Sequence, residues 1–357
     1  MKVENPAERC TSSGGEDFFN ITPLWSSGEG IYSEIVLSSR IRLARNLAAF
    51  KFPILSSVKE IEEVFAFISE RISFVPIFSL AHFSAFEHKL LLERHLVSNE
   101  LLKEIAGRGV GIFSGESISF MLNEEDHLRM QSIVSGLELA LAYKKLNELD
   151  DTFSTSLGFA FSPKFGYLTS CPTNVGTGMR ASVLLHLPAL VHSSKIRKIV
   201  DNLASIGFIV RGFHSESAHI EGNFFHLSTQ PTIGRKEEDL ISGLHKIVMQ
   251  LIEYENSARE LLLKNAHLQV EDKIWRAMSI LKSARLLSVD EFVNLSSAVR
   301  LGVGLGILKD VKISTLNQLL IFVQPAHLGK LLGEPKELAE YDMRRAMYVR
   351  ELLNKGG

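Results

Sequence analysis

The sequence feature that most constrains the fold is a change in hydrophobic periodicity near Lys236. Before it, short stretches such as 35–46 alternate apolar and polar residues, which is typical of half-buried strands. After it, apolar residues recur every three or four positions, which is typical of amphipathic helices. We therefore predict an α+β chain with an irregular arm over 1–30, a strand-containing domain over 31–255 and an all-helical domain over 256–357.

Length and charge limit the classes of protein that the chain can belong to. Its 357 residues exceed the usual size of one core, and 39 Lys+Arg against 41 Asp+Glu give a net charge of −2. This balance excludes an overall basic field that would recruit nucleic acid or a membrane, so any anion site must be local. Two cysteines make no disulfide framework, the N-terminus lacks a signal-peptide layout, and no apolar run reaches the roughly 18 residues of a membrane span. We expect a cytoplasmic protein.

A polar, glycine-punctuated stretch from Cys171 to Arg180 precedes the apolar run 181–191. We expect this run to be a helix, whose N-terminal N–H groups would stabilise an anion while Arg180 adds a bidentate phosphate contact. The stretch is neither a Walker loop nor a dinucleotide fingerprint, because its spacing differs from both. The alternative interpretation is an ordinary loop with a helix cap.

Paired arginines occur upstream, where residues 35–46 alternate as a strand. Arg40 and Arg42 are two residues apart, so both guanidinium groups should lie on one face of the strand and reach one polyphosphate. A solvated strand edge is the alternative for such a pair. The sequence therefore favours a phosphate site built from two separate segments.

Both segments resemble the ATP:guanidino phosphotransferases, the phosphagen kinases. The stretch Cys-Pro-Thr-Asn-Val-Gly-Thr is similar to their signature loop, and Ser-Ser-Arg-Ile-Arg is similar to their nucleotide-binding strand. The resemblance implies an antiparallel sheet flanked by helices, ATP as cofactor, and Mg²⁺ carried by the nucleotide rather than by a protein metal site. It also implies an adenine-side position for His95, and phosphate contacts from Ser38, Ser39, Arg40, Ile41, Arg42, Arg129, Arg180, Ala181, Ser182, Val183, Leu184, Arg211 and Gly212.

An acidic segment, Asn-Glu-Glu-Asp-His-Leu-Arg over 123–129, follows an alternating strand and could by itself be a solvated turn. It matches the family's corresponding segment letter for letter, which implies that Glu125 is the base and Arg129 a phosphate clamp. A guanidinium, with a pKa above about 12, needs such a carboxylate to accept its proton. The resemblance also makes Glu216 the second carboxylate, on a closing loop after Arg211. Cys171 either tunes the guanidinium electrostatically as a thiolate or is a packed structural thiol.

The domain order resembles one branch of the family, the bacterial protein-arginine kinases. Only 37 residues precede Ser38, whereas kinases of small guanidino compounds carry a helical domain there. The resemblance implies phosphorylation of arginine side chains in proteins, marking them for Clp-type proteolysis, with an activator protein and a homodimer as possible partners. Residues 341–346 are similar to that group's phosphoarginine-binding motif, with Asp342 and Arg345 retained and Tyr341 in place of an arginine. A kinase of a small guanidino compound and a non-catalytic phosphoarginine adaptor are the alternatives.

Overall fold

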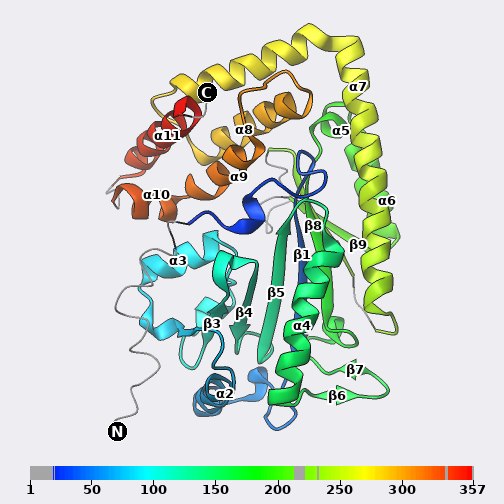
Figure 1. Ribbon diagram of the computed structural model, residues 1–357, viewed down its shortest axis with the longest axis vertical. Coiled ribbons are helices and arrows are strands. Elements are labelled where there is room, and N and C mark those ends of the chain that lie inside the picture. The colour runs from blue at the N-terminus through cyan, green and yellow to red at the C-terminus, as the bar shows by residue number, and fades with distance from the viewer. Residues whose placement is uncertain (1–18, 20, 213–221, 231–232, 334–336, 356–357) are drawn as a thin grey trace.

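The fold is an eight-stranded antiparallel sheet with a helical region joined to it (Figure 1). The computed structural model describes residues 19, 21–212, 222–230, 233–333 and 337–355. The strand order is β2-β3-β4-β5-β1-β8-β10-β9, and β6 and β7 form a separate two-stranded hairpin. The strands are β1 Val36–Arg45, β2 Ile77–Ser79, β3 Gly109–Ile112, β4 Ile118–Leu122, β5 Leu128–Ser135, β6 Phe161–Ser162, β7 Gly166–Tyr167, β8 Met179–His186, β9 Phe208–Gly212 and β10 Phe224–Thr229. The α+β class is thus confirmed.

The two faces of the sheet differ in chemistry because side chains alternate along each strand. On one face, apolar residues of β1, β5 and β8 such as Ile41, Met130 and Val183 form the main core. Helix α4 (Leu139–Leu157) packs over β1 and β5 on this side, and α7 (Glu237–Ser283) packs against β8. The opposite face carries the polar side chains of the same strands.

The helical region follows the sheet in sequence. Its helices are α8 Val289–Gly304, α9 Ile313–Phe322, α10 Pro325–Leu332 and α11 Leu338–Lys355, and those of the sheet region are α2 Val58–Arg71, α3 Ala85–Glu93, α5 Pro188–His192 and α6 Ile196–Ser205. Ser57 and Glu60 form a capping box at the start of α2. Within the described residues, no helix is long and apolar enough to cross a membrane.

Helix α7 connects the two largest hydrophobic cores of the described residues. Its residues up to Ala258 belong to the core beneath the sheet, and those from Ile274 onward belong to a second core with α8, α9 and α11. The helix bends sharply between these halves, where Ala266 has non-helical angles (φ −147°, ψ 36°), as Figure 1 shows. The predicted boundary at 255/256 therefore falls inside a helix.

The segment after the signature loop is strand β8, and the predicted helix there is wrong. A short apolar run does not distinguish a buried strand from a buried helix by periodicity. Here β1 pairs with β8 on one side and β10 pairs with it on the other, so the run lies in the middle of the sheet. The loop therefore delivers Arg180 to a strand rather than to a helix N-terminus.

Candidate active site

The polar face of the sheet brings arginines from several strands together. Arg42 of β1 lies opposite Arg180 of β8 and Gln131 of β5, and Arg129 of β5 lies opposite Ala44. Because cross-strand partners share a face, these side chains and Arg40 lie on the same side, which confirms the prediction for the β1 pair. Further across the sheet, Ser182 opposes Arg40, and Arg211 opposes His226.

The arginines repel one another in this arrangement. Burial and the nearby Arg129 lower the pKa of Arg40 to about 9. Burial together with Arg40, Arg129 and Arg180 also lowers the pKa of Arg42, and burial with Arg211 and Arg129 lowers that of Arg180. Among the described residues, the Nε atoms of Arg40 and Arg42 are buried without a hydrogen-bond partner. A polyanion would relieve the repulsion and satisfy these donors.

Glu124 is the acid that offsets part of this charge. It is buried, forms an ion pair with Arg129 and accepts a hydrogen bond from the Ser98 hydroxyl. Burial by itself would raise the pKa of Glu124, but Arg129 and Ser98 outweigh it and the pKa is lowered. Glu124 therefore stays ionised and holds the Arg129 guanidinium in place.

The neighbouring acids have separate roles in the turn between β4 and β5. Asp126 is buried, and its Oδ1 accepts hydrogen bonds from Asn46 Nδ2 (2.6 Å) and from the Ser170 backbone N–H (2.7 Å). This contact ties the acidic turn to the signature loop. Glu125 is exposed, and partial burial followed by the charge of Asp126 raises its pKa. A raised pKa suits a carboxylate that accepts a proton.

Cys171 lies beside this turn, one residue after Ser170. Its thiol is half-buried, and Sγ lies 3.0 Å from the Thr173 hydroxyl. Thr169 Oγ1 donates to the Cys171 carbonyl at 2.8 Å and fixes the backbone. The hydrogen bond between Asp126 and Ser170 therefore holds the segment that carries Cys171 next to the turn that carries Glu125.

Some predicted phosphate contacts lie on the wrong face. The side chains of Ile41, Ala181 and Val183 belong to the main core, because they alternate with the arginines, whereas Leu184 shares the face of Ser182 but packs in the second core. Ser39 is also buried, with its hydroxyl bonded to the backbone of Gly136 and Glu138. The side chains of Ile41, Ala181, Val183 and Ser39 therefore point away from the arginine cluster, and that of Leu184 is used in core packing. The remaining predicted contacts that the structure describes are Ser38, Ser182, Gly212 and the arginines. Glu216 lies outside the described residues.

The sequence analysis missed several polar residues of this face. Gln131 Nε2 donates to the His95 carbonyl (2.8 Å), and its Oε1 accepts from the Arg40 guanidinium. His226 of β10 is half-buried; burial, followed by His95 and Arg40, lowers its pKa to about 3. The alternation of β5 could have placed Gln131 on the same face as Arg129. However, a glutamine or a histidine in a strand does not by itself indicate a binding role, so nothing in the sequence was a reason to select Gln131 or His226. His95 itself is exposed and lies two residues after the end of α3.

The C-terminal motif lies away from the arginine cluster, in the helical region. Arg345 is only 2% exposed and donates to the Val323 carbonyl (2.9 Å), the Leu287 carbonyl (2.7 Å) and Asp342 Oδ1 (2.6 Å). Tyr341 is half-buried on the same helix. Arg345 thus joins α11 to the end of α9 and to the segment before α8.

The chain is similar to known proteins in both sequence and fold. The family profile "ATP:guanido phosphotransferase, C-terminal catalytic domain" matches residues 56–258, and "Protein-arginine kinase McsB C-terminal domain" matches 267–356. Similar proteins called protein-arginine kinase occur in Geobacillus thermodenitrificans (42% identical over 95% of this chain and 96% of the relative) and Geobacillus stearothermophilus (41% over 96% and 96%). Lombricine kinase shares the fold, with a TM-score of 0.58 at 21% identity over 64% of this chain and 68% of that chain. The duplicated taurocyamine kinase from Schistosoma mansoni also shares the fold, with a TM-score of 0.59 at 24% identity over 78% of this chain and 40% of that chain. The chain therefore belongs to the ATP:guanido phosphotransferase family.

Proposed function

We propose that this protein is an ATP-dependent protein-arginine kinase, which transfers the γ-phosphoryl group of ATP to the guanidinium of arginine residues in proteins. The observation that carries the proposal is the cluster of mutually repelling arginines on one sheet face, next to a turn whose exposed Glu125 has a raised pKa. The close relatives called protein-arginine kinase support the choice of acceptor. The same resemblance extends the proposal to a cytoplasmic enzyme that marks proteins for Clp-type proteolysis.

The mechanism follows from the charge distribution of phosphoryl transfer. In the transition state, charge spreads over the phosphoryl oxygens, so the protein acts mainly by position and electrostatics. Arg40, Arg42, Arg129 and Arg180 hold the phosphates, and Glu124 keeps Arg129 oriented. Mg²⁺ bound to the nucleotide would supply further neutralisation of phosphate charge.

The acceptor is positioned from the other side of the transferred group. Glu125 orients the substrate guanidinium and accepts its proton as the N–P bond forms, while the leaving ADP retains the bridging oxygen. Glu216 is proposed as the second carboxylate, by resemblance. The Cys171 thiol would contact the same guanidinium, since Asp126 joins its segment to the acidic turn.

The test is transfer to a protein that contains arginine. Incubation with ATP labelled at the γ-phosphorus and an arginine-rich protein should give acid-labile label on arginine, located by mass spectrometry under non-acidic conditions. The matched control is the same protein with its arginines replaced by lysine. Labelling of free arginine but not of the protein would favour the small-molecule kinase, and acid-stable label would contradict both.

A further inference from the structure

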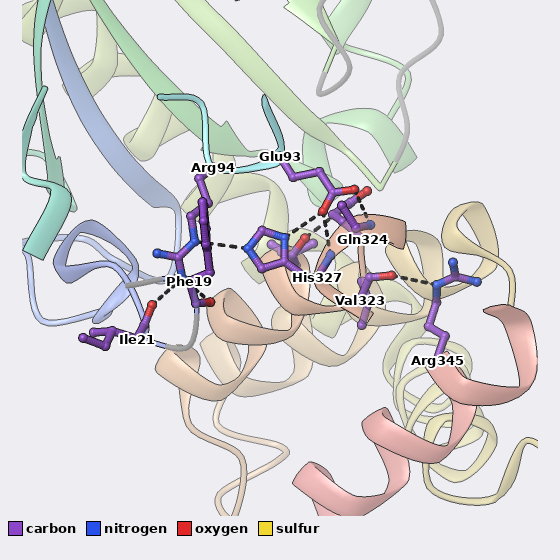
Figure 2. A network of polar contacts seen from close by, with 10 residues as sticks. Phe19, Ile21, Glu93, Arg94, Val323, Gln324, His327 and Arg345 are labelled. Atoms are coloured by element: carbon purple, nitrogen blue, oxygen red, sulfur yellow. Dashed lines mark hydrogen bonds and ion pairs between the residues drawn. The ribbon is translucent and has the colours of Figure 1, made fainter. Parts of the chain in front are cut away.

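A buried polar network joins the helical region to the sheet region at the end of α3. Both carboxylate oxygens of Glu93 accept backbone N–H groups at the start of α10, from Ala326 (2.8 Å) and His327 (3.0 Å). Glu93 also bonds His327 Nδ1 at 2.7 Å. On the other side of the ring, Arg94 Nε donates to His327 Nε2 at 3.1 Å (Figure 2). The imidazole of His327 in α10 is therefore held between Glu93 and Arg94, two consecutive residues at the end of α3.

These contacts fix both the tautomer and the orientation of His327. Its Nε2 accepts a hydrogen bond from Arg94 Nε, so Nδ1 carries the ring hydrogen and donates it in a hydrogen bond to Glu93. Burial lowers the pKa of His327, in keeping with a neutral ring. Arg94 is fully buried and is also held by Glu116 and by the backbone carbonyls of Phe19 and Ile21. These several contacts hold the Arg94 guanidinium in one orientation.

The network continues directly to the arginine cluster. His95, the residue after Arg94, has a left-handed backbone (φ 59°), which turns its carbonyl toward β5. That carbonyl accepts from Gln131 Nε2 at 2.8 Å, and Ser119 Oγ binds the same nitrogen at 2.8 Å. With its NH₂ group committed, Gln131 presents its Oε1 to the Arg40 guanidinium. Gln131 is 3% exposed, so water does not compete for these contacts.

We propose that His327 and Gln131 are positioning residues for Arg40, so that the helical region sets the phosphate-binding geometry of the sheet region. Arg40 needs such support because Arg129 repels it and Glu124, the nearby acid, is already paired with Arg129. Gln131 supplies an acceptor that holds the guanidinium without neutralising it. The inference rests on the proposed function only in assigning nucleotide phosphate as the ligand of Arg40.

The test compares nucleotide binding in four variants of the full-length protein. Gln131→Ala and His327→Ala should each raise the KM for ATP and the Kd for MgADP by roughly tenfold, the loss expected when a hydrogen bond to a charged group is disturbed. The KM for the arginine substrate should stay within about twofold, because the acceptor lies on the other side of the phosphoryl group. His327→Gln keeps an acceptor for Arg94 and should recover most of the affinity, whereas Gln131→Glu keeps an acceptor for Arg40 but loses the N–H donors to the His95 carbonyl and Ser119 and should not recover it.

A double-variant cycle tests whether the two residues act through one path. If they do, combining Gln131→Ala with His327→Ala should weaken MgADP binding little more than either change alone. The control is Ser297→Ala. The Ser297 hydroxyl joins α8 to the sheet region through hydrogen bonds with His186 Nε2 (2.8 Å) and Asn223 Nδ2 (2.8 Å), and neither contact involves Arg40. It should cost similar stability and leave the Kd for MgADP unchanged.

The outcomes separate this inference from the proposed function. Folded His327→Ala protein with the MgADP affinity of the Ser297→Ala control would overturn the inference, as would equal changes in both KM values. Additive effects in the cycle would also contradict it. If the parent binds MgADP but does not label protein arginine, the proposed function fails and the binding comparison still decides the inference. If the parent binds no MgADP, both are wrong.

Discussion

At the scale of single residues, three consecutive acids differ in what holds them. Glu124 is committed to Arg129 and Ser98, and Asp126 is committed to Asn46 and the Ser170 N–H. Glu125 is exposed, with a pKa raised by partial burial and by Asp126. Two acids therefore build the turn, and the middle one is available to a substrate.

Glu125→Gln should abolish phosphoryl transfer and leave MgADP affinity nearly unchanged, because this carboxylate serves the acceptor rather than the nucleotide. In the parent, kcat should fall as the pH drops through the raised pKa of Glu125, since only the ionised form accepts a proton. Single-turnover transfer and calorimetric binding measure the two effects. A variant with near-normal transfer would show that the base lies elsewhere.

Arg180→Ala should lower kcat by about 10²–10³, as loss of one preorganised charged donor costs about 2.7–4 kcal/mol in the transition state. The side chain comes directly after the signature loop and lies opposite Arg42. Arg197→Ala, on exposed α6, is the matched control. A loss of less than about tenfold would mean that the signature loop is structural.

Tyr341 is expected to weaken any phosphoarginine site in the helical region. Its hydroxyl offers a neutral hydrogen bond of about 0.5–1.5 kcal/mol in place of a charge-assisted one of about 1.5–3 kcal/mol. The guanidinium of Arg345 is already used by two carbonyls and Asp342. Tyr341→Arg should therefore strengthen phosphoarginine binding several-fold, and Tyr341→Gln should not. Tight binding by the parent, or no gain in the arginine variant, contradicts the expectation.

At the scale of elements, the buried ion pair between Arg45 and Asp150 joins β1 to α4 (2.7 Å). Arg45 also donates to the Thr177 carbonyl at 2.9 Å and lies 3.5 Å from the centre of the Tyr167 ring. The last residue of the arginine-bearing strand thus fixes the signature loop. The position of Arg180 depends on this junction as well as on its own strand.

Asp150→Ala should lower the free energy of unfolding by about 3–5 kcal/mol, because it leaves a buried guanidinium without its counter-charge. Urea denaturation measures the loss. Asp151→Ala, at the adjacent exposed position, should change stability by less than about 0.5 kcal/mol. Similar losses in the two variants would show that the ion pair is not what stabilises this junction.

The sequence predicts some of these elements better than others. Alternation along β1 correctly placed Arg40 and Arg42 on one face, because the side-chain period of a strand is two. It also implied that Ile41 faces the other way, yet the family pattern includes that residue among the phosphate contacts. The run after Arg180 is predicted to be a helix from the sequence, because a strand that is buried on both faces shows little alternation. Gln131 was missed because its role depends on a carbonyl from α3, which no local pattern encodes.

At the scale of the whole molecule, buried histidines link stability to pH. Burial lowers the pKa of His127 to about 4 and holds that of His186 well below its ordinary value. The folded state therefore binds fewer protons than the unfolded state. This stabilisation is complete above about pH 6.5 and is lost progressively as the pH falls below it.

Lowering the pH from about 7.5 to about 5.5 should cost about 3 kcal/mol of unfolding free energy from these two histidines, about 1.4 kcal/mol each. Urea denaturation at several pH values measures the slope. His186→Gln cannot titrate and should lose about half of it, whereas Ser297→Ala removes the hydrogen bond to this histidine and should keep the slope. An unchanged slope in His186→Gln would contradict the assignment.

The number of residues in the 47-residue α7 sets how the helical region is rotated relative to the sheet region, because the helix belongs to the cores of both. Each residue of a helix advances it by about 1.5 Å and turns it by about 100°. One residue inserted between Ala258 and Ile274 would therefore swing everything beyond it around the helix axis and draw His327 away from Glu93. Four inserted residues turn the helix by about 400°, slightly more than one full turn, and would roughly restore the direction with a displacement of about 6 Å. Insertions of about one full turn in this helix should consequently be tolerated better than insertions of one or two residues, because the number of residues in α7 sets the angle between the two regions.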